Sequence, residues 1–204
     1  YIVDINSEDK TELPLKFNTI NYASWSPVED KIAFIGVNGD RSNLYVYDLK
    51  KRMLETMTDD IFSDANPSWS ADGKKVIFTS DRSGFTDPKT IPSDIKMWNY
   101  DYSNTDYYSI DLKTKYIERL SDYKYSKESY AQVSADGKKT LYLSDKNGIT
   151  NIYLRETDSS GNKTDRPITN ALNPIDQLSL SRDGKKLLFI SLNKGGYDIF
   201  SINN

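Results

Sequence analysis

Pro67-Ser68-Trp69-Ser70-Ala71-Asp72-Gly73-Lys74-Lys75-Val76-Ile77-Phe78 is the stretch that decides the fold, because it contains two short strands and the turn between them. We predict that the first strand ends at Trp69-Ser70 and that the second contains the apolar residues Val76-Ile77-Phe78. Asp72-Gly73 is typical of a hairpin turn, since glycine adopts a positive φ without strain. The stretch therefore predicts an antiparallel pair of strands.

Three further stretches of the chain repeat this pattern. The uninterrupted repeats are spaced by about 45 residues, which is the range of β-propeller blades. The anchor serines of the four units are Ser26, Ser70, Ser134 and Ser181. The turn at Asp72-Gly73 recurs as Asp136-Gly137 and Asp183-Gly184. We interpret these aspartates as structural turn residues rather than cation ligands, since a side chain that bonds its own turn backbone explains their periodicity.

The rest of each unit supplies two more strands. A polar turn is followed by an apolar strand rich in tyrosine, and then by a strand that ends in an apolar-hydroxyl-Asx triplet. Four short strands separated by turns predict one antiparallel blade. The fold class is therefore all-β, a β-propeller of four-stranded antiparallel blades. Trp25 and Trp69 occupy equivalent positions and are predicted to lie in the core.

The chain is predicted to form one propeller domain over residues 1–204. Its repeat units cover about residues 1–20 (partial), 21–62, 63–125, 126–172 and 173–204. About four blades are visible, and residues 1–5 and 12–15 add an N-terminal half-repeat. Two hypotheses fit this phase: the N-terminal strand completes the last blade of a small closed ring, or the chain is part of a larger propeller.

Composition excludes several classes of function. The sequence contains neither histidine nor cysteine, so a Ser-His-Asp triad, a thiol nucleophile and an HExxH zinc site cannot form within the chain. The formal net charge is −3 and no basic block is present, which argues against nucleic-acid binding. No apolar run approaches the ~18 residues of a membrane helix. We therefore expect no enzymatic activity, no cofactor and no metal site.

The second unit resembles the repeat of TolB-type β-propellers. The resemblance lies in Trp69-Ser70, Asp72-Gly73-Lys74, Phe78, Ser80-Asp81-Arg82 and Gly84. It implies a non-catalytic scaffold of the cell envelope that binds proteins or other ligands, in a bacterial periplasm or on a cell surface. Two alternatives remain open. One is the substrate-gating propeller of a prolyl-oligopeptidase-like or tricorn-like peptidase, and the other is a carbohydrate-binding propeller.

Residues 83–106 interrupt the repeat between the second and third strands of unit two. Long loops on a propeller often carry function, and exposed aromatic residues favour a binding surface. The candidate partner-binding residues are Met97, Trp98, Tyr100 and Tyr102. The alternative is a local hairpin over residues 95–100 that folds its aromatics back onto the blade. We expect protein partners, with a small ligand or a glycan as alternatives.

Overall fold

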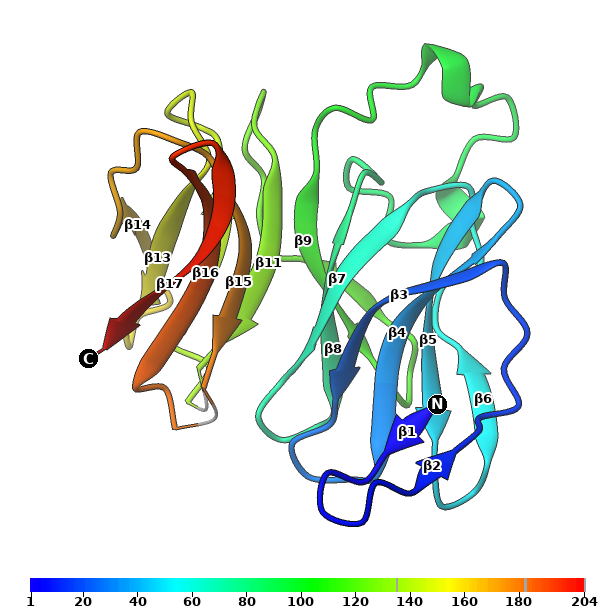
Figure 1. The fold of residues 1–204 in the computed structure, drawn as a ribbon. Helices are drawn as coiled ribbons and strands as arrows, with labels where there is room; N and C mark the ends of the chain where they lie inside the picture. Colours follow the sequence, from blue (N-terminus) through cyan, green and yellow to red (C-terminus); the bar gives the residue numbers. More distant parts are fainter. Residues whose placement is uncertain (135, 182, 204) are drawn as a thin grey trace.

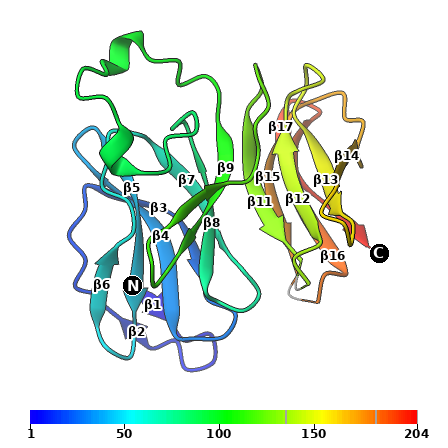
Figure 2. The same cartoon turned by 180° about the vertical axis from the view of Figure 1, so that it is seen from behind.

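The computed structural model is an all-β propeller arrangement of four antiparallel sheets with a small additional sheet at the N-terminus (Figures 1 and 2). The structure describes residues 1–134, 136–181 and 183–203, and of Met97 it describes the backbone but not the side chain. Within these residues no helix is long and apolar enough to cross a lipid bilayer. The predicted fold class is confirmed.

Each sheet corresponds to one repeat unit, and its strands follow one another in chain order. The N-terminal sheet pairs β1 (Ile2–Val3) with β2 (Lys10–Thr11). Blade 1 contains β3 (Thr19–Trp25), β4 (Lys31–Asn38), β5 (Arg41–Asp48) and β6 (Met53–Thr56). Blade 2 contains β7 (Asp64–Trp69), β8 (Lys75–Ser80), β9 (Asp106–Asp111) and β10 (Ile117–Arg119). Blade 3 contains β11 (Glu128–Val133), β12 (Lys139–Ser144), β13 (Asn151–Thr157) and β14 (Lys163–Pro167). Blade 4 contains β15 (Ile175–Leu180), β16 (Lys186–Asn193) and β17 (Gly196–Asn203).

The recurring motif folds as a hydrogen-bonded turn between the first two strands of a blade. In blade 2, Ser70 Oγ donates to Asp72 Oδ1 over 2.7 Å, and the same carboxylate oxygen accepts from the Lys74 amide. The Lys75 amide in turn donates to Ser70 Oγ, and Gly73 has a φ of +68°. Equivalent serine–aspartate bonds occur at Ser134 and Asp136 and at Ser181 and Asp183. This network explains why serine, aspartate and glycine recur together.

The hydroxyl of each apolar-hydroxyl-Asx triplet ties the end of a blade to its third strand. Thr58 Oγ1 accepts a hydrogen bond from the Leu44 amide over 2.8 Å and donates to Asp64 Oδ2. Ser121 accepts in the same way from the Tyr107 amide, and Thr169 from the Ile152 amide. The hydroxyl therefore satisfies a backbone group that would otherwise be buried without a partner.

Neighbouring blades pack through the faces of their sheets. Trp69 is 8% exposed and donates its indole N–H to the Ser24 carbonyl of blade 1 over 3.0 Å. Ser68 Oγ donates to the Ala131 carbonyl of blade 3 over 2.6 Å. Trp25, in contrast, is 55% exposed, because within the described residues its side of blade 1 faces only the small N-terminal sheet, across a cavity, instead of a full blade. The prediction that both tryptophans lie in the core is right for Trp69 and wrong for Trp25.

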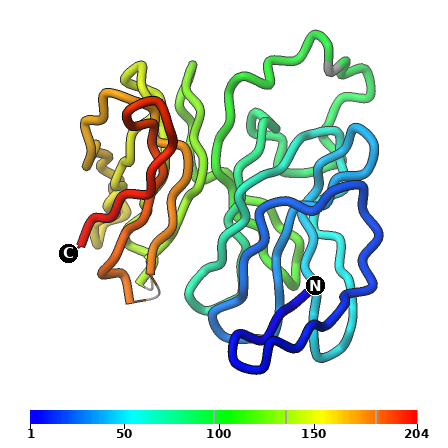
Figure 3. Tube along the Cα trace, in the orientation of Figure 1, coloured from blue at the N-terminus to red at the C-terminus, as the bar shows by residue number. Residues whose placement is uncertain are grey.

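The N-terminal half-repeat forms its own sheet and does not complete the last blade. Ile2 pairs with Thr11 and Val3 with Lys10, while blade 4 contains three described strands. The N-terminus lies beside blade 1, and the C-terminal strand β17 is on the opposite side of the molecule (Figure 3). Of the two predicted ring arrangements, the one in which the N-terminal strand completes blade 4 is therefore not the one that the structure adopts.

Candidate functional site

The insertion between β8 and β9 forms an open loop that projects from one end of blade 2 (Figure 1). It contains two short 3₁₀ turns, η1 (Pro88–Thr90) and η2 (Met97–Asn99). The alternative prediction of a hairpin over residues 95–100 is wrong, since the described structure has no strand there. Proline at the first position of η1 and the Asp87 cap, which accepts from the Lys89 amide, favour a tight helical turn instead.

Tyr100 anchors the insertion to blade 2. Its hydroxyl donates to the Asp81 carbonyl over 3.0 Å, and its ring lies 5.5 Å from the ring of Phe62. Phe62 also stacks on Phe85 at 5.7 Å, so both ends of the insertion contact the same buried ring. Burial raises the pKa of the Tyr100 hydroxyl, which therefore stays protonated and continues to donate. Tyr100 holds the loop in place rather than presenting a free surface.

The other candidate residues of the insertion differ in exposure. Trp98 is 77% exposed and Tyr102 is 61% exposed. The Lys96 ammonium lies 5.8 Å from the Trp98 ring centroid. Met97 belongs to η2, but its side chain lies outside the described part of the structure. Two large aromatic side chains thus face solvent on a loop that Tyr100 secures.

Tyr102 also lines a cavity of about 420 Å³ at the base of the insertion. The cavity is walled by the first two strands of blade 2, the residue that follows β8, and the end of the insertion. Its lining residues are Ser63, Ala65, Thr79, Asp81, Tyr102 and Thr105. Hydroxyl groups and one carboxylate therefore dominate its polar lining.

Asp81 is the charged residue of this cavity, and it is 4% exposed. Its Oδ1 accepts a hydrogen bond from the Ser63 amide over 2.9 Å. Within the described part of the chain, Oδ2 has no hydrogen-bond partner. Burial raises the pKa of Asp81 to about 6, since the hydrogen bond from the Ser63 amide and the charge of Arg82 compensate the lost hydration only in part.

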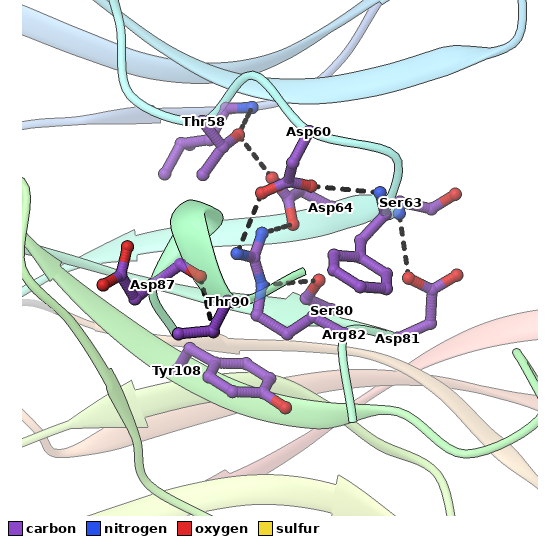
Figure 4. A network of polar contacts seen from close by, with 12 residues as sticks. Thr58, Asp60, Ser63, Asp64, Ser80, Asp81, Arg82, Asp87, Thr90 and Tyr108 are labelled. Carbon is purple, nitrogen blue, oxygen red and sulfur yellow. Dashed lines mark hydrogen bonds and ion pairs between the residues drawn. The ribbon is translucent and has the colours of Figure 1, made fainter. Parts of the chain in front are cut away.

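Arg82 lies beside the cavity at the centre of a buried polar network (Figure 4). Its guanidinium is 1% exposed and makes ion pairs with Asp60 at 3.1 Å and Asp64 at 2.8 Å. Its Nε donates to Ser80 Oγ over 3.0 Å. Because Asp60 and Asp64 belong to the segment that enters blade 2, the network joins that segment to the end of β8. Through Asp64, which accepts from Thr58, the network also reaches the end of blade 1.

The environment of Arg82 keeps its charge. Burial disfavours the ionised guanidinium, but Asp64 and Asp60 outweigh that cost and raise its pKa. Three aromatic rings surround the guanidinium, with centroids 5.1–5.7 Å away. They belong to Phe62, Phe78 and Tyr108. Arg82 is therefore a fixed structural cation whose donors already point at other residues.

Known proteins support the repeat assignment. A family model described as the TolB beta propeller domain matches residues 1–89. The chain is a β-propeller that is similar to TolB over this stretch. The solved structure of TolB from Acinetobacter baumannii is 25% identical to it, with a TM-score of 0.64 over 91% of this chain and 41% of that one. No curated protein matches the sequence.

Two further structures share the propeller fold. Putative TolB from Agrobacterium tumefaciens is 19% identical, with a TM-score of 0.66 over 90% of this chain and 61% of that one. Hydrazine synthase from Kuenenia stuttgartiensis is 14% identical, with a TM-score of 0.66 over 98% of this chain and 33% of that one. The TolB-like chain thus spans less than two thirds of the length of each of these structures.

In blade 3 of the TolB-like propeller, Lys146 takes the position that Arg82 has in blade 2. Lys146 follows β12 as Arg82 follows β8, but its ammonium lies over the rings of Tyr123 and Tyr153 at 4.2 and 4.1 Å. Glu128 is fully buried, and its Oε2 has no partner among the described residues. Burial raises the pKa of Glu128 to about 7. Blade 3 therefore does not repeat the Asp-Arg pairing at this position, and its buried guanidinium, Arg155, pairs with Asp165 instead.

A larger cavity of about 560 Å³ lies between the N-terminal sheet and blade 1. Its lining is mainly apolar and includes Trp25, Phe34 and Leu13. It lies against one face of blade 1. In blade 2, the equivalent face is covered by blade 1. We assign this cavity to incomplete packing of a blade face rather than to recognition of a specific ligand.

Metal binding finds no support in the described residues. No group of three or more carboxylate side chains within that part of the chain is placed to hold a metal ion. In Asp72, Asp136 and Asp183, one carboxylate oxygen accepts a hydrogen bond from the backbone of its own turn.

The sequence singled out the insertion but not Thr79 or Asp81 as cavity residues. No sequence signal places these two residues with Tyr102, because the loop conformation brings them together.

Proposed function

We propose that this TolB-like propeller is a non-catalytic binding module that holds a protein partner on the face carrying residues 83–106. The observation that carries the proposal is the pairing of a secured loop with exposed aromatics. Tyr100 binds the loop to blade 2, while Trp98 and Tyr102 face solvent next to the cavity that contains Asp81. Exposed aromatic side chains on a fixed loop beside a cavity are typical of protein interfaces.

Energetic reasons support this surface as a binding site. Tryptophan and tyrosine are the residues that most often dominate binding free energy, because they bury a large area with few rotatable bonds. A loop that is already ordered loses less conformational entropy on binding than a mobile one. The TolB resemblance further supports a bacterial cell-envelope or cell-surface location, where this face would meet its partner. A small ligand or a glycan is the alternative occupant of the same surface.

The test is selection of peptides against the intact chain, followed by affinity measurement. A displayed random peptide library is panned on the wild type, and selected peptides are measured against Trp98→Ala/Tyr102→Ala. We expect the double variant to lose about tenfold or more in affinity, as removal of central aromatic contacts does. Tyr116→Ala is the matched control, because Tyr116 is 66% exposed on the turn at the other end of β9. Selected peptides that bind the double variant as well as the wild type would contradict the proposal.

A further inference from the structure

The cavity beneath Tyr102 is lined by acceptors that the protein leaves partly unused. Asp81 Oδ2 has no partner among the described residues, whereas Oδ1 accepts from the Ser63 amide. Thr79 is 5% exposed, and its Oγ1 is buried with no hydrogen-bond partner. Thr105 Oγ1 donates to the Glu128 carbonyl and keeps its lone pairs free to accept. A buried hydroxyl without a hydrogen-bond partner costs free energy. A ligand that forms a hydrogen bond with this hydroxyl removes that cost, which favours binding.

Charge around the cavity is not balanced by the protein. Asp60, Asp64 and Asp81 surround Arg82, so three carboxylates share one guanidinium. Both terminal nitrogens of that guanidinium point to Asp60 and Asp64, and Figure 4 shows Asp81 lying apart from it beside Ser63. The Asp81 carboxylate therefore faces the cavity without a directly bonded cation. The local field favours a positive ligand group and disfavours an anion.

The geometry of the lining selects among cations. Metal ions prefer several carboxylate oxygens, and the described residues bring only Asp81 to this cavity. A primary ammonium carries three N–H donors and no acceptor, which suits one carboxylate oxygen and two hydroxyl oxygens. Tyr102 at the same cavity offers a ring against which an alkyl stem can pack and a cation can lie.

We propose that the cavity formed by Asp81, Thr79, Thr105 and Tyr102 is a subsite for a primary ammonium group of the bound polypeptide. The ammonium donates to the free oxygen of Asp81 and to the Thr79 hydroxyl, while its alkyl stem lies against Tyr102. A lysine side chain and a free chain N-terminus share this chemistry. The inference rests on the proposed function, since it names the group that the insertion-bearing face recognises. The cavity volume of about 420 Å³ lies within the range of small-ligand pockets.

The experiment titrates short peptides into the intact chain and follows binding by NMR chemical-shift changes. The probes are acetyl-Gly-Lys-Gly-amide, the same peptide with acetylated lysine, and Gly-Gly-Gly-amide with a free N-terminus. Acetylation removes the charge and keeps the stem. We expect the lysine peptide or the peptide with a free N-terminus to bind. The acetylated peptide should bind with an affinity lower by about tenfold or more, because a charge-assisted hydrogen bond is lost. The probe that binds more tightly identifies the source of the ammonium.

Two cavity variants and one control locate the binding. Asp81→Asn removes the charge but keeps the acceptor for the Ser63 amide, and Thr79→Val removes the hydroxyl without changing the volume. Both should weaken the tighter peptide about tenfold, whereas Asp72→Asn, on a turn at the other end of the blade, should not. Thermal melts test whether each variant is folded. If Asp81→Asn does not fold, the binding affinity of Thr79→Val decides whether the cavity binds the ammonium group.

Any of three results would overturn the ammonium subsite. These are equal binding of charged and acetylated peptides, undiminished binding by both folded cavity variants, and no binding of either amine probe by the wild type. The proposed function is tested separately. If library peptides without an essential amine bind in a Trp98- and Tyr102-dependent way, the binding module stands and the ammonium subsite falls.

Discussion

Replacement of Arg82 by methionine tests whether the buried polar network holds blade 2 together. Methionine has a similar length and no charge, so it can fill the space between the aromatic rings while removing every ionic contact. The change leaves Asp60 and Asp64 buried with side-chain exposures of 4% and 0% and without their cation. Thr58 would remain as a donor to Asp64, but it cannot supply a compensating charge.

The expected loss follows from the cost of breaking a buried ion pair by removing one partner. That cost is about 3–5 kcal/mol of unfolding free energy. For a chain of this size, each kcal/mol lowers the melting temperature by roughly 2–4 °C, so we expect a decrease of about 6–20 °C. Burial already raises the pKa of the Asp64 carboxyl, and removal of Arg82 takes away the charge that opposes this rise. The stability of the variant relative to the wild type should therefore be greatest at acidic pH and fall as pH rises toward the raised pKa of Asp64.

Thermal and urea denaturation at several pH values between about 5 and 8 measures both effects. Lys50→Met is the control, because the Lys50–Asp30 pair has side-chain exposures of 80% and 58% and should contribute little. A second variant, Arg82→Met with Asp60→Asn and Asp64→Asn, should recover part of the loss and flatten the pH dependence. If Arg82→Met changes the melting temperature no more than Lys50→Met does, the network is not what stabilises the entry to blade 2.

Three further predictions use matched positions in the repeat. Gly73→Ala should lower the melting temperature more than Gly137→Ala; the two glycines share a φ near +70°, but only at Gly73 would a Cβ collide with a valine of blade 1. Equal decreases in melting temperature would show that the contact with the valine does not contribute. Trp69→Phe should cost about 1–3 kcal/mol, because the partly buried Ser24 carbonyl loses its indole donor. Trp25→Phe, at an exposed position, should cost much less, and the reverse order in urea melts would refute this. Asp81→Asn should gain stability relative to the wild type as pH rises from 4 through about 6, since the raised pKa of Asp81 makes its protonated form the stable one; a constant difference across pH would contradict the assignment.

The repeat made most of the fold predictable because each of its residues has a local task. Serine, aspartate and glycine close a turn within six residues, as Ser70, Asp72 and Gly73 show. The triplet hydroxyls bond one strand away, as Thr58 does with Leu44. Such short-range requirements leave a periodic trace in the sequence. Strand order follows from them, since each turn joins neighbours in the same sheet.

Equivalent positions in the repeat did not ensure equivalent surroundings. Trp25 and Trp69 occupy the same place in the motif, yet the second is buried against blade 1 and the first is half exposed. Lys146 follows its strand as Arg82 does, but it contacts tyrosine rings instead of carboxylates. Burial depends on what lies across the blade face, and local periodicity carries no information about that.

The candidate site lies where the periodic pattern stops, and for that reason its form was not predictable. The sequence identified the insertion and its aromatic residues, but it did not distinguish the anchor Tyr100 from the exposed Trp98 and Tyr102. That distinction depends on a contact with Phe62 and on the carbonyl of Asp81. Residues 62 and 100 are far apart in the chain, and no spacing rule relates them.

The sequence by itself determined the blade, its turns, its strand order and the place at which the repeat is interrupted. It also excluded histidine- and cysteine-dependent chemistry within the chain. Only the tertiary structure decided which blade faces are covered, where the N-terminal strand pairs, and that Thr79, Asp81 and Tyr102 share a cavity. The physical reason is the range of the interactions. Turn geometry and hydrogen bonds between adjacent strands act over a few residues, whereas burial and charge balance depend on groups brought together from distant parts of the chain.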